Sequence, residues 1–115
     1  MPTTPPTKVS YAPYFENAAK RLQRKYRHLA NDLHPLVEQL EQGETPGDQI
    51  PGIGYTFYKV RVKNSDVAKG KSGGYRVVYY LKTTTHTVLL NIYAKSEASD
   101  IALDLIRRII AESNA

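Results

Sequence analysis

The chain has 115 residues, no cysteine and a formal net charge of +5 at neutral pH. This length suits one domain that buries a core without a disulfide or a structural metal, and the lack of cysteine excludes disulfides and cysteine-based zinc sites. The sequence has no run of 18 apolar residues, and its first residues lack the apolar stretch of a signal peptide. We therefore expect a soluble, cytoplasmic protein without a membrane segment.

The N-terminal segment is set apart by its composition. Residues 1–12 begin with three prolines and three threonines in the first seven positions, and they are expected to form a flexible arm or a short strand at 8–11. The rest of the chain, residues 13–115, is expected to fold as a single domain.

Two helices are predicted after this arm. Apolar residues recur from Pro13 at helical spacing, at Phe15, Ala18, Ala19, Leu22, Tyr26 and Leu29. The opposite face of this helix is basic and is interpreted as a solvated surface. Asn31 and Asp32 are expected to interrupt the helix, with Asp32 capping a second one that has Pro35 in its first turn and ends at Gly43.

A loop at 44–54 and three strands follow, at 55–63, 75–82 and 87–95. Each strand alternates, and short links predict antiparallel neighbours. One face is expected to hold Thr56, Tyr58, Val60, Val62, Tyr75, Val77, Tyr79, Leu81, Val88, Leu90, Ile92 and Ala94. The other is expected to hold Tyr55, Phe57, Lys59, Arg61, Lys63, Arg76, Val78, Tyr80, Lys82, Leu89, Asn91, Tyr93 and Lys95.

A last helix is predicted after Ser96, which is a suitable cap. The expected fold is therefore α+β: an N-terminal helical hairpin packed on an antiparallel sheet of three to four strands, with a C-terminal helix. The apolar face of the sheet is expected to receive the hairpin.

The positive charge of the chain is concentrated on the predicted sheet. Residues 59–95 carry eight basic side chains and one acidic one, whereas residues 1–58 carry six of each and residues 96–115 are net negative. On one strand face the heads of Lys59, Arg61 and Lys63 are expected about 7 Å apart, near the spacing of nucleic acid phosphates. The same surface is expected to include Lys69, Lys71, Arg76, Tyr80, Lys82, Tyr93 and Lys95. Cations that repel one another in this way predict a polyanionic ligand.

Two other motifs are rejected. The run Gly70-Lys71-Ser72 resembles the end of a phosphate-binding P-loop, but Ser65 occupies the position of the required first glycine and a strand follows instead of a helix. The three histidines have no spacing suited to zinc, so they are interpreted as surface or capping residues. No metal and no cofactor are expected.

The chain resembles the RelE/ParE superfamily of bacterial toxins from type II toxin–antitoxin pairs, and most closely its RelE-like, HigB-related branch. The resemblance covers about residues 13–112. It rests on Gly-Ile-Gly-Tyr at 52–55, Tyr-Lys-Val-Arg at 58–61, Gly-Lys-Ser-Gly-Gly-Tyr-Arg at 70–76 and Leu-Asn-Ile-Tyr-Ala-Lys at 90–95.

The resemblance implies a metal-independent endoribonuclease that cleaves messenger RNA on the ribosome and is inhibited by a cognate antitoxin. In this chemistry the ribose 2′-OH attacks its own phosphate, which requires a base, cations for the developing charge and an acid. Lys59 and Arg61 match positions of catalytic lysines, and Arg76 matches a strand arginine that stabilises the transition state. Lys63, Lys69, Lys71, Tyr80 and Lys82 are expected to contact RNA.

The pattern departs from the family near the C-terminus. Ser96 and Ala102 stand where RelE-type toxins carry an arginine and a catalytic tyrosine, so Tyr93 and Lys95 are the candidates for the general acid. Two alternatives remain open. One is a ParE-like toxin that inhibits DNA gyrase, and the other is a catalytically weak RNA-binding member held by its antitoxin.

Overall fold

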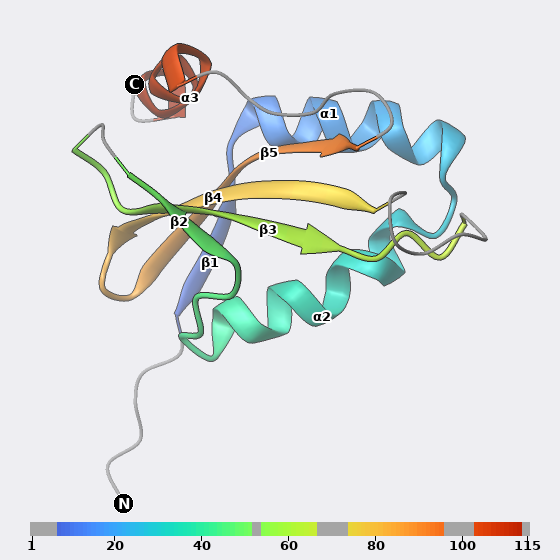
Figure 1. Cartoon of the computed structure of the whole chain (residues 1–115), viewed down its shortest axis with the longest axis horizontal. Helices are drawn as coiled ribbons and strands as arrows, with labels where there is room; N and C mark the ends of the chain where they lie inside the picture. The colour runs from blue at the N-terminus through green and yellow to red at the C-terminus, as the bar shows by residue number, and fades with distance from the viewer. Residues whose placement is uncertain (1–6, 52–53, 67–73, 96–102, 114–115) are drawn as a thin grey trace, which may run out of the picture.

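The structure is a computed structural model that describes residues 7–51, 54–66, 74–95 and 103–113. Within these residues a mixed sheet of five strands has the order β1-β5-β4-β3-β2 (Figure 1). The strands are β1 (Lys8–Tyr11), β2 (Asp48–Ile50), β3 (Phe57–Val62), β4 (Tyr75–Thr83) and β5 (His86–Ala94). The predicted α+β class is confirmed, but the expected antiparallel sheet of three to four strands is wrong in number and direction.

The two additional strands lie at opposite edges of the sheet. β1 pairs in parallel with β5, and β2 pairs antiparallel with β3. The helical hairpin follows β1 and precedes β2 in the chain, and it crosses one face of the sheet from the β1 edge to the β2 edge (Figure 1). β1 confirms the optional strand at 8–11. β2 corrects the prediction that 44–54 is entirely loop.

The hairpin consists of α1 (Pro13–Lys25) and α2 (Leu29–Glu41). The predicted break at Asn31 and Asp32 is wrong, because α1 ends at Lys25, with Tyr26 as its C-cap, and α2 has already begun at Leu29. Tyr26 is extended and its buried ring packs edge-on against the ring of Tyr75, with centroids 5.7 Å apart. The first helix therefore ends next to a residue that packs on the sheet. Pro35, expected in the first turn of the second helix, lies inside α2.

The sheet has an apolar core on each face. On the hairpin side the core includes Phe15, Leu22, Leu36, Leu40, Val60, Val77, Tyr79, Leu89, Ile92 and Ala94. On the other side α3 (Leu103–Ser113) buries Ile106, Ile109 and Ile110 against Phe57, Val78, Tyr80, Val88 and Leu90. None of the helices in the described ranges combines the length and hydrophobicity needed to span a lipid bilayer.

The alternation predicted for β3 and β4 is confirmed. In β5 the predicted faces hold for Ile92 and Ala94 but are wrong for Val88, Leu89 and Leu90. Val78 pairs with Asn91 whereas Tyr79 pairs with Leu89, so Leu90 is an extra residue in the ladder. Such a bulge changes the phase of the alternation, so the side chains on its two sides follow different patterns. Leu89 therefore packs under the hairpin, while Leu90 packs under α3.

Candidate polyanion site

A pocket of about 260 Å³ lies on the same sheet face as α3, outside the apolar cluster beneath that helix. Its lining consists of Asp48, Lys59, Arg61, Arg76 and Lys95. Four of the five residues predicted as catalytic therefore line one cavity, together with a carboxylate that the sequence analysis did not single out. The lining suits an anionic ligand, since four of its five side chains are cationic.

The strand register explains why these side chains meet. In the β3–β4 ladder Lys59 is opposite Val78 and Arg61 is opposite Arg76. Lys59 and Arg61 are two residues apart, so both point to the same face. Lys95 directly follows β5, and its backbone N–H donates to the carbonyl oxygen of Gly74 at 3.0 Å. Because this bond joins the end of β5 to the start of β4, Lys95 is held near Arg76.

Arg76 is the most enclosed cation of the pocket, with 7% of its surface exposed. Its Nη1 donates to the Tyr75 carbonyl oxygen at 3.2 Å. Burial lowers the pKa of Arg76, and the facing Arg61 lowers it further. Like charges directly opposite on neighbouring strands are destabilising. The fold thus keeps a desolvated guanidinium beside a second one, an arrangement that a bound anion would relieve.

Gly74 leaves room for this guanidinium. A Cβ at Gly74 would lie 2.6 Å from the Val62 carbonyl oxygen and 3.5 Å from Nη1 of Arg76. Any other residue would therefore force β3 and β4 apart at the edge of the pocket. This glycine ends the Gly-Lys-Ser-Gly-Gly run, whose other residues at 70–73 lie outside the described part of the chain.

Asp48 reaches the pocket because β2 pairs with β3, which puts Asp48 opposite Lys59. Gly47 makes this pairing possible: its φ is +97°, and a Cβ there would overlap the Lys59 carbonyl oxygen and approach the Cβ of Val60 to 2.8 Å. The buried hydroxyl of Tyr79 donates to the carbonyl oxygen of Pro46. Burial raises the pKa of Tyr79, so its hydroxyl stays protonated and remains a donor.

The remaining predicted site residues lie elsewhere. Tyr93 is buried opposite Arg76 but is not part of the pocket lining. Tyr80 is 1% exposed and packs edge-on against Tyr55, so its ring does not face solvent. Exposed Lys82 lines a separate pocket of about 190 Å³ with Ser10 and His86, among others. Lys69, Lys71, Ser96 and Ala102 lie outside the described residues.

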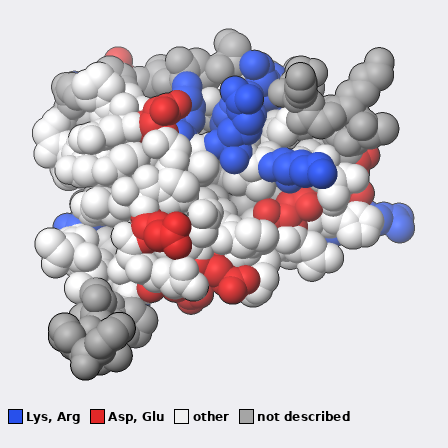
Figure 2. All heavy atoms as spheres, turned by 60° about the horizontal axis from the view of Figure 1, so that its bottom comes forward, with Lys and Arg blue, Asp and Glu red and all other residues white. Residues whose placement is uncertain are grey.

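Lys63 extends the basic surface away from the pocket. It is exposed and lines a groove of about 210 Å³ with Arg61 and part of α2. Figure 2 shows lysine and arginine side chains gathered in one area of the molecular surface, with acidic side chains beside and below them. Within the charge concentration predicted from the sequence, Lys59, Arg61, Arg76 and Lys95 line one pocket.

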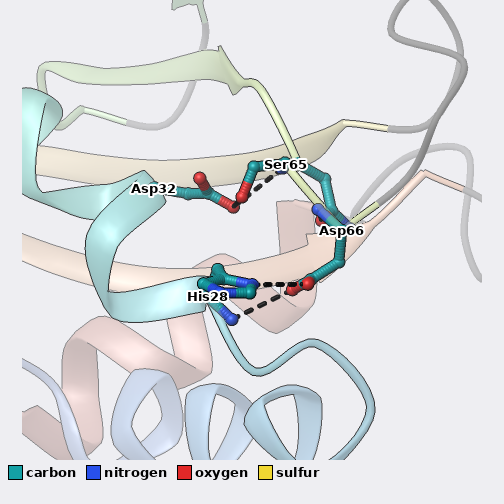
Figure 3. A network of polar contacts seen from close by, with 5 residues as sticks. His28, Asp32, Ser65 and Asp66 are labelled. Carbon is teal, nitrogen blue, oxygen red and sulfur yellow. Dashed lines mark hydrogen bonds and ion pairs between the residues drawn. The ribbon is translucent and has the colours of Figure 1, made fainter.

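A polar network ties the helical hairpin to the chain just after β3 (Figure 3). The backbone N–H of His28 donates to one carboxylate oxygen of Asp66 at 2.9 Å, and the ring Nδ1 lies 2.6 Å from the other. Both the N–H and the hydroxyl of Ser65 donate to Asp32. The side-chain hydrogen bond to Asp66 raises the pKa of His28. The backbone N–H of His28, followed by its ring, lowers the pKa of Asp66. The network therefore anchors both residues of the Ser65-Asp66 turn.

Each of the three histidines has a structural role or partner. His28 occupies the N-cap position of α2, exposed His34 pairs with Glu38 at 2.9 Å, and His86 bonds to the hydroxyl of Ser10 at 2.7 Å. Among the described residues, no group of three histidine or carboxylate side chains is arranged to hold a metal ion.

Fold and site together define a small α+β protein with a cationic pocket on one face of a five-stranded sheet. Residues 14–111 match the family described as RelE toxin of the RelE/RelB toxin–antitoxin system. The chain therefore belongs to the RelE toxin family, and this membership implies an antitoxin as its partner.

One solved structure also aligns with the chain, the crystal structure of TrmO from Pseudomonas aeruginosa. The two share 17% sequence identity with a TM-score of 0.49, over 79% of this chain and 37% of the TrmO chain. A likeness of this size carries no argument about fold or function.

Proposed function

We propose that this protein is a metal-independent endoribonuclease of the HigB-related branch that cleaves messenger RNA on the ribosome. The pocket formed by Asp48, Lys59, Arg61, Arg76 and Lys95 carries this proposal. Its four cations supply positive charge where a phosphorane would form, and the same cations would repel a metal ion.

The proposed reaction is an internal transesterification. The ribose 2′-oxygen loses its proton and bonds to the adjacent phosphorus, the bond from phosphorus to the 5′-oxygen breaks, and the leaving oxygen takes a proton. The products are a 2′,3′-cyclic phosphate and a 5′-hydroxyl. Arg76 and Arg61 lie opposite each other and stabilise the equatorial oxygens, and Lys59 adds a third donor.

Lys95 is assigned as the acid that protonates the leaving 5′-oxygen. It lines the pocket, whereas Tyr93, the other candidate, does not. Exposed Lys63 and Lys82 extend the contact along the RNA backbone. The antitoxin is proposed to block cleavage by covering this basic face with acidic side chains.

The proposal is tested by mapping RNA 5′ ends after incubation with mRNA-programmed ribosomes. We expect cleavage that leaves 5′-hydroxyl ends, and no cleavage when the ribose before the scissile phosphate is 2′-deoxy. Arg76→Gln should lower the cleavage rate by about 10²- to 10³-fold, the usual effect of removing one transition-state donor. Arg108→Gln, which removes the same charge from an exposed position on α3, is the matched control and should cleave like the wild type.

Other results would redirect the assignment. RNA binding without cleavage would identify a catalytically weak RNA-binding member. Loss of gyrase supercoiling without RNA cleavage would identify a ParE-like toxin. Equal cleavage by Arg76→Gln and the wild type would remove Arg76 from the site.

A further inference from the structure

The chemistry of the pocket leaves one role unfilled. Ammonium and guanidinium groups donate hydrogen bonds and have no acceptor, so Lys59, Arg61, Arg76 and Lys95 cannot receive a proton while charged. An ionised carboxylate is only an acceptor. Among the described residues of the lining, Asp48 is therefore the one whose side chain is suited to accept a proton from a hydroxyl group.

The position of Asp48 suits contact with a substrate. Its side chain is exposed, lines the cavity and lies on the strand next to Lys59. In the described part of the chain no salt bridge engages the Asp48 carboxylate. Its oxygens are thus available to a ligand whose phosphate is held by the neighbouring cations.

The backbone before Asp48 is held rigidly. The Tyr79 hydroxyl binds the Pro46 carbonyl, and Gly47 packs directly against the backbone of β3. A catalytic group gains from such preorganisation, because proton transfer requires hydrogen-bond reach in a defined direction. A surface carboxylate that only balanced charge would need neither constraint.

We propose that Asp48 is the general base of the cleavage reaction, an inference that rests on the proposed function. The Asp48 carboxylate takes the proton of the 2′-OH while the 2′-oxygen bonds to phosphorus. The electron pair of the breaking bond leaves with the 5′-oxygen, which takes a proton from the Lys95 ammonium. Asp48 then returns its proton to solvent and Lys95 is reprotonated, so protons and electrons balance.

A charge-balancing role and a catalytic role predict opposite results for Asp48→Asn. Removing a negative charge from a cationic pocket strengthens RNA binding in both cases. If Asp48 is the base, single-turnover cleavage falls by about 10²- to 10⁴-fold despite this binding. If Asp48 only balances charge, cleavage is unchanged or faster.

The experiment measures affinity for a 2′-deoxy-blocked mRNA on programmed ribosomes and the single-turnover rate on the unblocked mRNA. Glu44→Gln is the matched control, because Glu44 is exposed, shortly precedes β2 and lies outside the pocket. Asp48→Glu should recover part of the rate, and added formate should partly restore Asp48→Ala. Circular dichroism checks that each variant is folded, and the Ala and Glu variants decide the question if Asn does not fold.

The two proposals fail in distinguishable ways. A wild type that leaves the RNA intact overturns the endoribonuclease proposal itself. A wild type that yields 5′-hydroxyl ends, with an Asp48→Asn variant within threefold of its rate, overturns only the assignment of Asp48. Loss of RNA binding in the folded Asn variant also contradicts it, since a base does not hold the phosphate.

Discussion

Replacing Arg76 by glutamine should stabilise the fold while it abolishes the proposed activity. Arg76 is 7% exposed, lies opposite Arg61 and donates a hydrogen bond to the Tyr75 carbonyl oxygen. Residues selected for ligand contact often lower stability in this way. The change keeps a side chain that is polar and unbranched, so it creates little strain.

The magnitude follows from three opposing effects. Relief of the repulsion from Arg61 contributes up to about 1 kcal/mol. Relief of the desolvation of a buried charge contributes about 1–3 kcal/mol. Loss of the bond to the Tyr75 carbonyl costs about 1 kcal/mol. We therefore expect the free energy of unfolding to rise by about 1 kcal/mol, or Tm by about 4 °C for a domain of this size.

Urea unfolding of the wild type and the Arg76→Gln variant measures this difference. A 2′-deoxy oligonucleotide should then stabilise the wild type more than the variant, because only the wild type retains the full set of phosphate contacts. At a hundredfold excess over Kd, bound ligand adds about 2.7 kcal/mol. Arg108→Gln, exposed on α3, should change neither stability nor ligand response.

Destabilisation by more than about 2 kcal/mol would refute the reasoning, because it would mean that Arg76 is needed to hold the strands together. Equal stabilisation of both proteins by the oligonucleotide would also refute it, since Arg76 would then have no part in binding.

Three further predictions concern the scaffold. Gly47→Ala should lower the free energy of unfolding in urea by about 1–3 kcal/mol, because Gly47 has a positive φ and an added Cβ would overlap β3. The loss should exceed that of Gly54→Ala, where an added Cβ meets nothing within 4 Å, and equal losses would contradict the close packing of β2 on β3. The His28–Asp66 pair should stabilise fully between pH 3.8 and 6.5, the ordinary values of the two groups. Its contribution to stability is lost as pH rises through the raised pKa of His28 or falls through the lowered pKa of Asp66. If the free energy of unfolding differs between the wild type and Asp66→Asn by the same amount at every pH, the pair does not act in this way. Leu22→Ala should lower the free energy of unfolding by about 2–5 kcal/mol, since Leu22 is 2% exposed in the core beneath the hairpin. A loss under 1 kcal/mol would place Leu22 outside that core.

Local pattern was sufficient for the part of the site that lies on β3 and β4. Strict alternation assigned Lys59, Arg61 and Arg76 to one face, and short links made their strands neighbours. Side chains two residues apart on a strand point the same way whatever surrounds them. For this reason the cationic face was predictable without coordinates.

Tertiary pairing decided the rest. β2 has only three residues, too few to show a period, and it exists because Gly47 lets the chain lie against β3; Asp48 enters the pocket only through that pairing. The bulge at Leu90 reverses the faces of Val88, Leu89 and Leu90. The first helix is followed by Tyr26, whose ring packs on Tyr75, and not by a break at Asn31 and Asp32. These features depend on contacts between residues far apart in the chain, whose free energy outweighs local preference. A sequence read in short windows carries no sign of them.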